Sequence, residues 1–119
     1  MSLDSPLKKT MNAHSLAQLR TDARQIFQAG ISAANPEIAV KQAITVAAHH
    51  LELALDLNNR ENVRIGRWPK IHLIALGKAA CTMAKAAQEA IPAHLLSEKS
   101  LVVTNYENRR DLDNLTVIG

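Results

Sequence analysis

Residues 71–91 contain the pattern that most restricts how this chain can fold. Residues 71–76 are almost all apolar, as is typical of a β-strand buried on both faces. Gly77 follows as a turn, and residues 78–91 have the composition of a helix that ends before Pro92. A buried strand followed at once by a helix is the first half of a βαβ unit. The pattern therefore predicts a parallel sheet.

Two further apolar segments extend this sheet. Residues 101–104 complete a βαβ unit of about 30 residues, and the usual right-handed crossover makes the two strands parallel. A charged loop over residues 109–114 leads to a third strand at residues 115–118. Hydrophobic residues make up 47% of the chain and aromatic residues only 3%, so the core must consist of alanine and aliphatic side chains. This composition favours helices packed closely on a sheet over a β-sandwich.

The first half of the chain is predicted to be helical. Residues 15–29 carry apolar side chains at helical spacing, and residues 36–57 repeat that pattern after a capping Asn35. Residues 60–70 read as a polar connector. Residues 1–14 are polar and are expected to form a flexible arm, which leaves residues 15–119 as one domain.

Composition and charge exclude several classes of function. The net charge of +3 is too small and too spread out to indicate nucleic-acid binding. A single cysteine excludes an internal disulfide and a cysteine-cluster metal site. No apolar run approaches the roughly 20 residues of a membrane helix, and the N-terminus lacks the apolar region of a signal peptide. We therefore expect a cytoplasmic protein.

Gly77, Lys78 and Ala79 form the candidate binding site. Open α/β sheets bind ligands beyond the carboxyl ends of their strands, where helix N-termini attract anions such as phosphate. The segment is not a P-loop, because His72 replaces the upstream glycine and Ala79 replaces the serine or threonine. It also lacks the three glycines of a dinucleotide fingerprint. A tight turn followed by a solvated lysine is the plain alternative, and spacing alone leaves it open.

Other reactive side chains show weaker patterns. Cys81 lies in the first turn of the predicted helix without a visible partner, which favours a buried structural thiol over a nucleophile. The histidines, including His49 and His50 near Glu52, do not match a metal-ligand spacing, so we expect no metal site. The predicted connector carries four basic residues: Arg60, Arg64, Arg67 and Lys70. Their arrangement indicates a solvent-exposed segment rather than an anion-binding site.

The predicted strand-and-helix segment contains two distinctive runs, Ala-Leu-Gly-Lys-Ala-Ala (75–80) and Met-Ala-Lys-Ala-Ala (83–87). Both runs resemble the N-terminal region of the glycerate 2-kinases. These are the MOFRL-type glycerate kinases, which carry a DUF4147 domain and have sometimes been labelled hydroxypyruvate reductases. Members show a strand, then Gly-x-Gly-Lys-Ala-Ala or a near variant, then x-x-Met-Ala-x-Ala-Ala-Glu. Ala75 departs from the first glycine, and Glu89 lies one place late. The resemblance covers about residues 19–119.

The resemblance implies an α/β fold in which N-terminal helices precede a Rossmann-like βαβ unit with parallel strands, within a larger three-layer domain. It implies ATP- and Mg²⁺-dependent phosphorylation of the 2-hydroxyl of D-glycerate, so glycerate and ATP would be the partners. Lys78 would be the catalytic residue, acting on the moving phosphoryl group or on the glycerate carboxylate. Gly77 and Ala79 would line the cofactor site, and no residue here would bind metal.

The family pattern continues beyond the third strand with a Gly-His-Pro-x-Pro-Asp segment, nucleotide-binding loops and a second domain. Gly119 falls just short of that segment, so residues 15–119 are expected to be an incomplete N-terminal Rossmann-like glycerate kinase domain, inactive alone. The alternative is a truncated non-catalytic remnant or a small anion-binding module. Such a fragment would self-associate through an open face or edge of its sheet.

Overall fold

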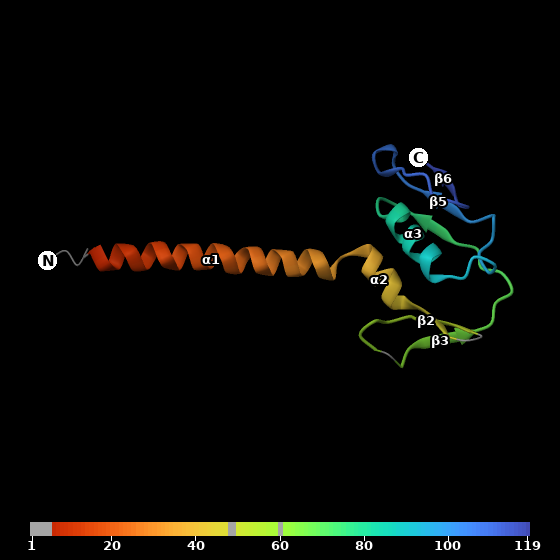
Figure 1. Ribbon diagram of the computed structural model, residues 1–119, viewed down its shortest axis with the longest axis horizontal. Coiled ribbons are helices and arrows are strands. Elements are labelled where there is room, and N and C mark those ends of the chain that lie inside the picture. Colours follow the sequence, from red (N-terminus) through yellow and green to blue (C-terminus); the bar gives the residue numbers. More distant parts are fainter. Residues whose placement is uncertain (1–5, 48–49, 60) are drawn as a thin grey trace. The chain divides into compact units, whose positions relative to one another are not determined.

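The computed structural model describes residues 6–47, 50–59 and 61–119. The chain divides into two compact units, and a long helix forms the first of them (Figure 1). Helix α1 spans Pro6–Ala33, so it begins before the predicted start at Ser15. The predicted arm of residues 1–14 overlaps this helix; its first five residues lie outside the described part, and its flexibility stays a prediction. No helix among the described residues is long and apolar enough to cross a membrane.

The second unit, residues 36–119, opens with helix α2 (Pro36–Ala43) and strands β1 (Ile44–Ala47) and β2 (His50–Ala54). The predicted helix over residues 36–57 is therefore wrong after Ala43. The run Ile-Thr-Val at residues 44–46 is β-branched and favours an extended backbone. Antiparallel pairing then places apolar side chains opposite one another, and Leu51 is only 4% exposed.

The predicted polar connector also contains a strand. Strand β3 (Val63–Gly66) pairs antiparallel with β2 and completes a three-stranded sheet in the order β1-β2-β3. Its apolar residues alternate with Arg64 in the period-two pattern of a strand, but the run is short and flanked by charges, so the pattern is weak in the sequence. Arg60 of the predicted cationic group lies outside the described residues.

The predicted parallel unit is confirmed. Strand β4 (Ile74–Leu76) leads through helix α3 (Ala80–Ala90) to β5 (Leu101–Val103), and β6 (Thr116–Ile118) follows. The order is β4-β5-β6, and both pairings are parallel. The fold class is thus α/β, as predicted. The first strand is shorter than expected, and Ile71 contributes only an isolated parallel bridge to Leu96.

The core lies between α3 and one face of this sheet. Ala84 on α3 and Val102 at the centre of β5 are both fully buried, and Ala80 and Ala87 belong to the same cluster. Small side chains allow the helix backbone to approach the strands closely, which accounts for a core almost without aromatic residues. Ser100 is also fully buried. Its hydroxyl donates a hydrogen bond to the Ser97 carbonyl oxygen at 2.7 Å, so this polar group has a partner inside the core.

The opposite face of the parallel sheet is largely uncovered in this chain. Ile74 and Leu76 on β4 are 66% and 71% exposed, and Ile118 on β6 is 49% exposed. The register brings Leu76, Val103 and Ile118 into one row across the sheet. Parallel sheets usually carry helices on both faces, so this face is a surface that suits a covering element. Self-association through it stays a prediction.

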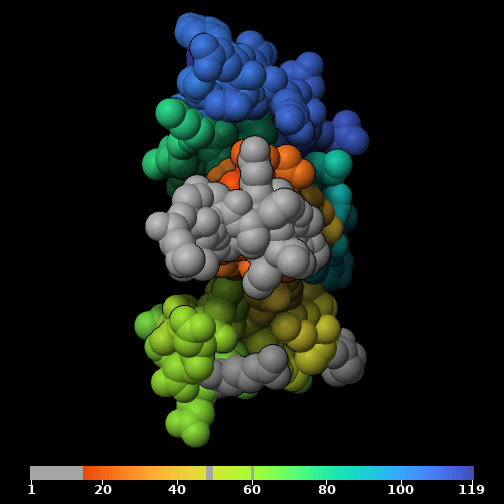
Figure 2. All heavy atoms as spheres, turned by 90° about the vertical axis from the view of Figure 1, so that its left-hand side faces the viewer, coloured from red at the N-terminus to blue at the C-terminus, as the bar shows by residue number. Residues whose placement is uncertain are grey.

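An ion-pair bridge joins the two helices of the second unit. The Lys41 ammonium on α2 lies 2.7 Å from Glu37 and 2.9 Å from Glu89 on α3. Hydrogen bonds to Glu37 and then Glu89 raise the pKa of Lys41 above its ordinary value, and the bond to Lys41 lowers the pKa of Glu89. All three groups are exposed, so the bridge contributes little to stability. In Figure 2 the yellow to yellow-green segment, which carries the antiparallel sheet, lies at the bottom, and the blue segment, which carries β5 and β6, lies at the top.

Candidate functional site

The three predicted site residues lie together at the carboxyl edge of the parallel sheet. Gly77, Lys78 and Ala79 form the turn between the end of β4 and the start of α3. Because β4, β5 and β6 are parallel, the segments that follow them emerge at this same edge. These are Thr104 and Asn105 after β5, and Gly119 after β6. The edge therefore gathers groups from three separate parts of the chain.

Gly77 sets the direction of the turn. Its φ angle is +109°, a backbone conformation that residues with a Cβ rarely adopt. Its N–H donates to the Val103 carbonyl oxygen at 2.9 Å, and its carbonyl oxygen accepts from the Ala80 N–H at 3.1 Å. These two bonds tie the turn to β5 and to α3. No atom lies within 4 Å of a Cβ built on Gly77, so backbone conformation rather than crowding requires glycine.

We expect Gly77→Ala to lower the free energy of unfolding by about 1–2 kcal/mol, because the left-handed conformation strains any residue with a Cβ. Urea unfolding followed by circular dichroism measures this loss. Gly30→Ala is the matched control, since Gly30 is helical and also has open space around it. It should not destabilise the chain, because alanine favours helix over glycine. Equal losses in both variants would contradict the assigned conformation.

Positive charge accumulates at the start of α3. Lys78 is exposed, and no ion pair to it is found among the described residues. Ala79 occupies the N-cap position and cannot cap with its side chain, and the first turn holds no acidic residue. The Ala80 N–H donates to the Gly77 carbonyl oxygen, and no side-chain hydrogen bond caps the start of the helix. The helix dipole adds to the positive charge of Lys78. An anion is the ligand that this arrangement suits.

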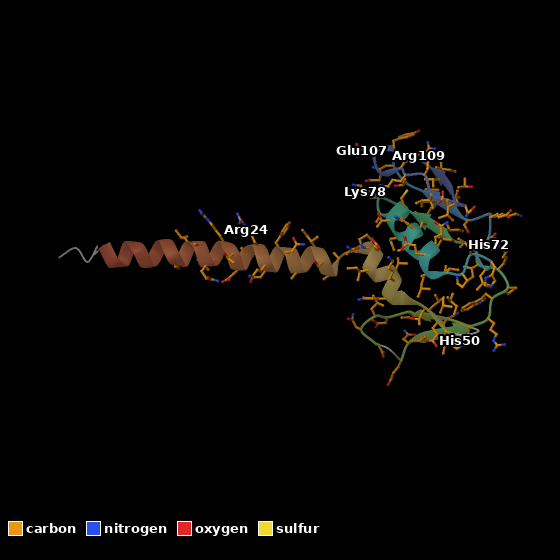
Figure 3. The ribbon with its side chains drawn as sticks, in the orientation of Figure 1. Arg24, His50, His72, Lys78, Glu107 and Arg109 are labelled. Carbon is orange, nitrogen blue, oxygen red and sulfur yellow. The ribbon has the colours of Figure 1, made fainter. Side chains whose placement is uncertain are left out.

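A second cation reaches the same edge from the segment after β5. The short helix η1 (Tyr106–Asn108) turns the chain, and the Asn105 side chain accepts a hydrogen bond from Asn108 at 2.6 Å. Arg109 then lies over Gly119, where an added Cβ would be 3.1 Å from its Cδ. Figure 3 shows Lys78, Glu107 and Arg109 at one end of the parallel sheet.

The sequence did not predict that Arg109 lies at this edge of the sheet. Arg109 belongs to the predicted charged loop, and no spacing rule relates it to Lys78, because only the sheet topology brings the two segments together. The Arg110 carbonyl oxygen accepts a weak hydrogen bond from the Cys81 Sγ at 3.9 Å, which anchors the loop to the first turn of α3. Cys81 itself is buried, as predicted for a structural thiol.

The remaining candidates do not join this site. His50 on β2 pairs with Glu52 at 2.9 Å, and Figure 3 places His50 and His72 away from Lys78. Among the residues whose side chains the structure describes, 15–47, 50–59 and 61–119, no group of three His, Cys, Asp or Glu could hold a metal ion. His49 lies outside the described residues.

Comparison with known proteins relates most of the chain to one family. Residues 22–119 match the family described as a domain of unknown function, DUF4147. The crystal structure of the PH0495 protein from Pyrococcus horikoshii OT3 is similar, with a TM-score of 0.62 and 30% sequence identity. The match covers 84% of this chain and 20% of that one, so the chain spans about a fifth of that protein's length. No curated protein matches the sequence.

Proposed function

The chain belongs to the DUF4147 family, and from this premise we propose that it is the N-terminal part of an ATP-dependent kinase that phosphorylates the 2-hydroxyl of D-glycerate. The observation that carries the proposal is Lys78, an exposed cation beside an uncapped helix N-terminus at the carboxyl edge of a parallel sheet. The Gly-Lys-Ala-Ala segment that resembles the glycerate 2-kinases occupies this turn. Phosphate and carboxylate groups both suit such a site.

Lys78 would act through its charge. Phosphoryl transfer depends mainly on positioning the reactants and stabilising charge on the moving group. An ammonium at this turn presents a compact point charge with three donors, rather than the planar fork of an arginine. It would stabilise either the transferring phosphoryl group or the glycerate carboxylate. In both cases the positive charge stabilises most strongly the atoms on which negative charge develops in the transition state.

The neighbouring residues make room for a ligand. Gly77 carries no side chain, and the open space around it allows a phosphate to approach the backbone. No side-chain hydrogen bond caps the start of α3 at Ala79, so a nucleotide phosphate suits this end of the helix. Mg²⁺ bound with the nucleotide would supply positive charge that neutralises the charge developing on the phosphates.

The rest of the active site would be supplied by a longer protein. The chain spans about a fifth of the length of the PH0495 protein, and the exposed apolar face of its sheet suits further covering elements. On this proposal, Lys78 belongs to one wall of a cleft between two domains. We therefore expect the 119-residue chain alone to be inactive.

The test compares two proteins in one assay. The 119-residue chain and a full-length protein that contains it are each incubated with ATP, Mg²⁺ and D-glycerate, and ADP formation is followed. We expect glycerate-dependent ADP formation from the full-length protein and none from the chain alone. Turnover by the chain alone would contradict the incomplete site. A folded full-length protein that never responds to glycerate would contradict the kinase proposal.

A further inference from the structure

A separate pocket lies at the other end of the second unit, away from Lys78. Its volume is about 400 Å³, which is within the range of small-molecule sites. One wall is the antiparallel sheet, and the other is the segment that follows α3, represented by Pro92 and Leu95. The proposed kinase function does not use this pocket.

The sheet wall of the pocket is apolar. Val46, Leu51 and Gly66 lie side by side on neighbouring strands, so they share one face of the sheet. Pro92 and Leu95 supply apolar surface on the facing segment. We call the space between this sheet face and the facing segment the slot, and a space bounded on two sides suits a planar molecule.

The single tryptophan of the chain closes one side of this slot. A Cβ added at Gly66 would lie 2.6 Å from the Cζ2 atom of Trp68, so only glycine allows the indole to rest on the strand. The half-buried indole lines the pocket. Aromatic rings stack on one another with a favourable energy beyond simple burial, so Trp68 favours an aromatic guest.

The polar side chains that line the pocket are two histidines and a permanent cation. Arg67 is exposed at its margin, and His50 and His94 also line it. Among the described residues that line the pocket, none is acidic. Glu52 lies nearby, but it bonds to the His50 Nε2 and lines a different pocket, which also contains Asp56. The two pockets beside this sheet therefore differ in charge.

We propose that the pocket beside Trp68 binds a planar aromatic carboxylate, whose ring lies in the slot and whose carboxylate meets Arg67. The apolar walls and the indole select the ring. The guanidinium pairs with a carboxylate through two parallel hydrogen bonds, which an alcohol or an amine cannot accept in the same way. The proposal is independent of the assignment of Lys78.

The test uses the full 119-residue chain and the probe 2-naphthoate. Because Trp68 is the only tryptophan, its indole N–H gives one resonance in a ¹H–¹⁵N spectrum, and that signal reports directly on the pocket. We expect 2-naphthoate to shift this resonance saturably. The uncharged analogue 2-naphthalenemethanol should bind about tenfold more weakly, as expected for the loss of a charged hydrogen bond.

Two arginine variants separate a specific contact from general charge. Arg67→Gln should weaken 2-naphthoate binding about tenfold, whereas Arg64→Gln should leave it unchanged, since Arg64 is exposed on β3 and does not line the pocket. Both side chains are exposed, so neither variant should unfold the chain. Equal weakening by both variants, equal binding of the acid and the alcohol, or a shift that does not saturate would each overturn the proposal.

Discussion

Replacing Lys78 with alanine in the full-length protein is expected to lower glycerate-phosphorylating activity by about a hundredfold or more. The reason is that the substitution removes a positive charge placed to stabilise the transition state, and such contacts are typically worth a factor of a hundred to a thousand. Lys78 is exposed and lies before the helix, so its removal should not disturb folding. The measurement is kcat and KM for D-glycerate, with circular dichroism to verify the fold.

Lys85→Ala is the matched control. Lys85 is an exposed lysine on α3, the helix that follows Lys78, and its ammonium lies 4.0 Å from Glu89, outside the carboxyl edge. Its removal changes net charge by the same amount and should leave activity within about twofold, because it touches neither reactant. Near-normal turnover in the Lys78→Ala protein, or equal losses in both variants, would contradict the assigned role of Lys78.

Val102→Asp is expected to abolish cooperative folding of the second unit. Val102 is fully buried at the centre of β5, between β4 and β6 and within the cluster formed with α3. A carboxylate there has no partner, and burying it costs about 4 kcal/mol or more, a large share of the stability of a small domain. Urea unfolding followed by circular dichroism measures the effect.

The adjacent position provides the comparison. Val103→Asp introduces the same carboxylate on the uncovered face of the sheet, in the row of Leu76 and Ile118. The charge can reach water there, so the loss of stability should be clearly smaller. Similar unfolding midpoints for the two variants would show that α3 does not cover the face that carries Val102.

The parallel unit could be predicted because each of its signals is local. An apolar run, one glycine and an alanine-rich segment ended by Pro92 determine the strand, the turn and the helix in succession. The positive φ angle of Gly77 also agrees with its predicted place in the turn. Close approach of α3 to the sheet follows from the same alanines.

The antiparallel sheet could not be predicted in the same way. Residues 44–54 carry apolar side chains that fit a helical period, whereas residues 44–47 and 50–54 form two short paired strands. Whether this segment forms a helix or strands depends on the β-branched run after Ala43 and on pairing with β3, which lies further along the chain. Tertiary pairing overrides local periodicity in segments this short.

The candidate site was predicted in part. Lys78 follows from its place after an apolar strand, whereas Arg109 reaches the same edge only because β5 and β6 lie beside β4. The pocket of Trp68 has no sequence signal either, because it joins the antiparallel sheet to the segment after α3. Residues far apart in the sequence meet there only after folding.

The most direct test of the kinase proposal identifies the product. The full-length protein is incubated with ATP, Mg²⁺ and D-glycerate, and the mixture is analysed by ³¹P nuclear magnetic resonance. Our account predicts a phosphate monoester on the 2-hydroxyl of glycerate, formed in equal amount to ADP and nearly absent with the Lys78→Ala protein. Phosphorylation at another position, or unchanged product formation without Lys78, would contradict it.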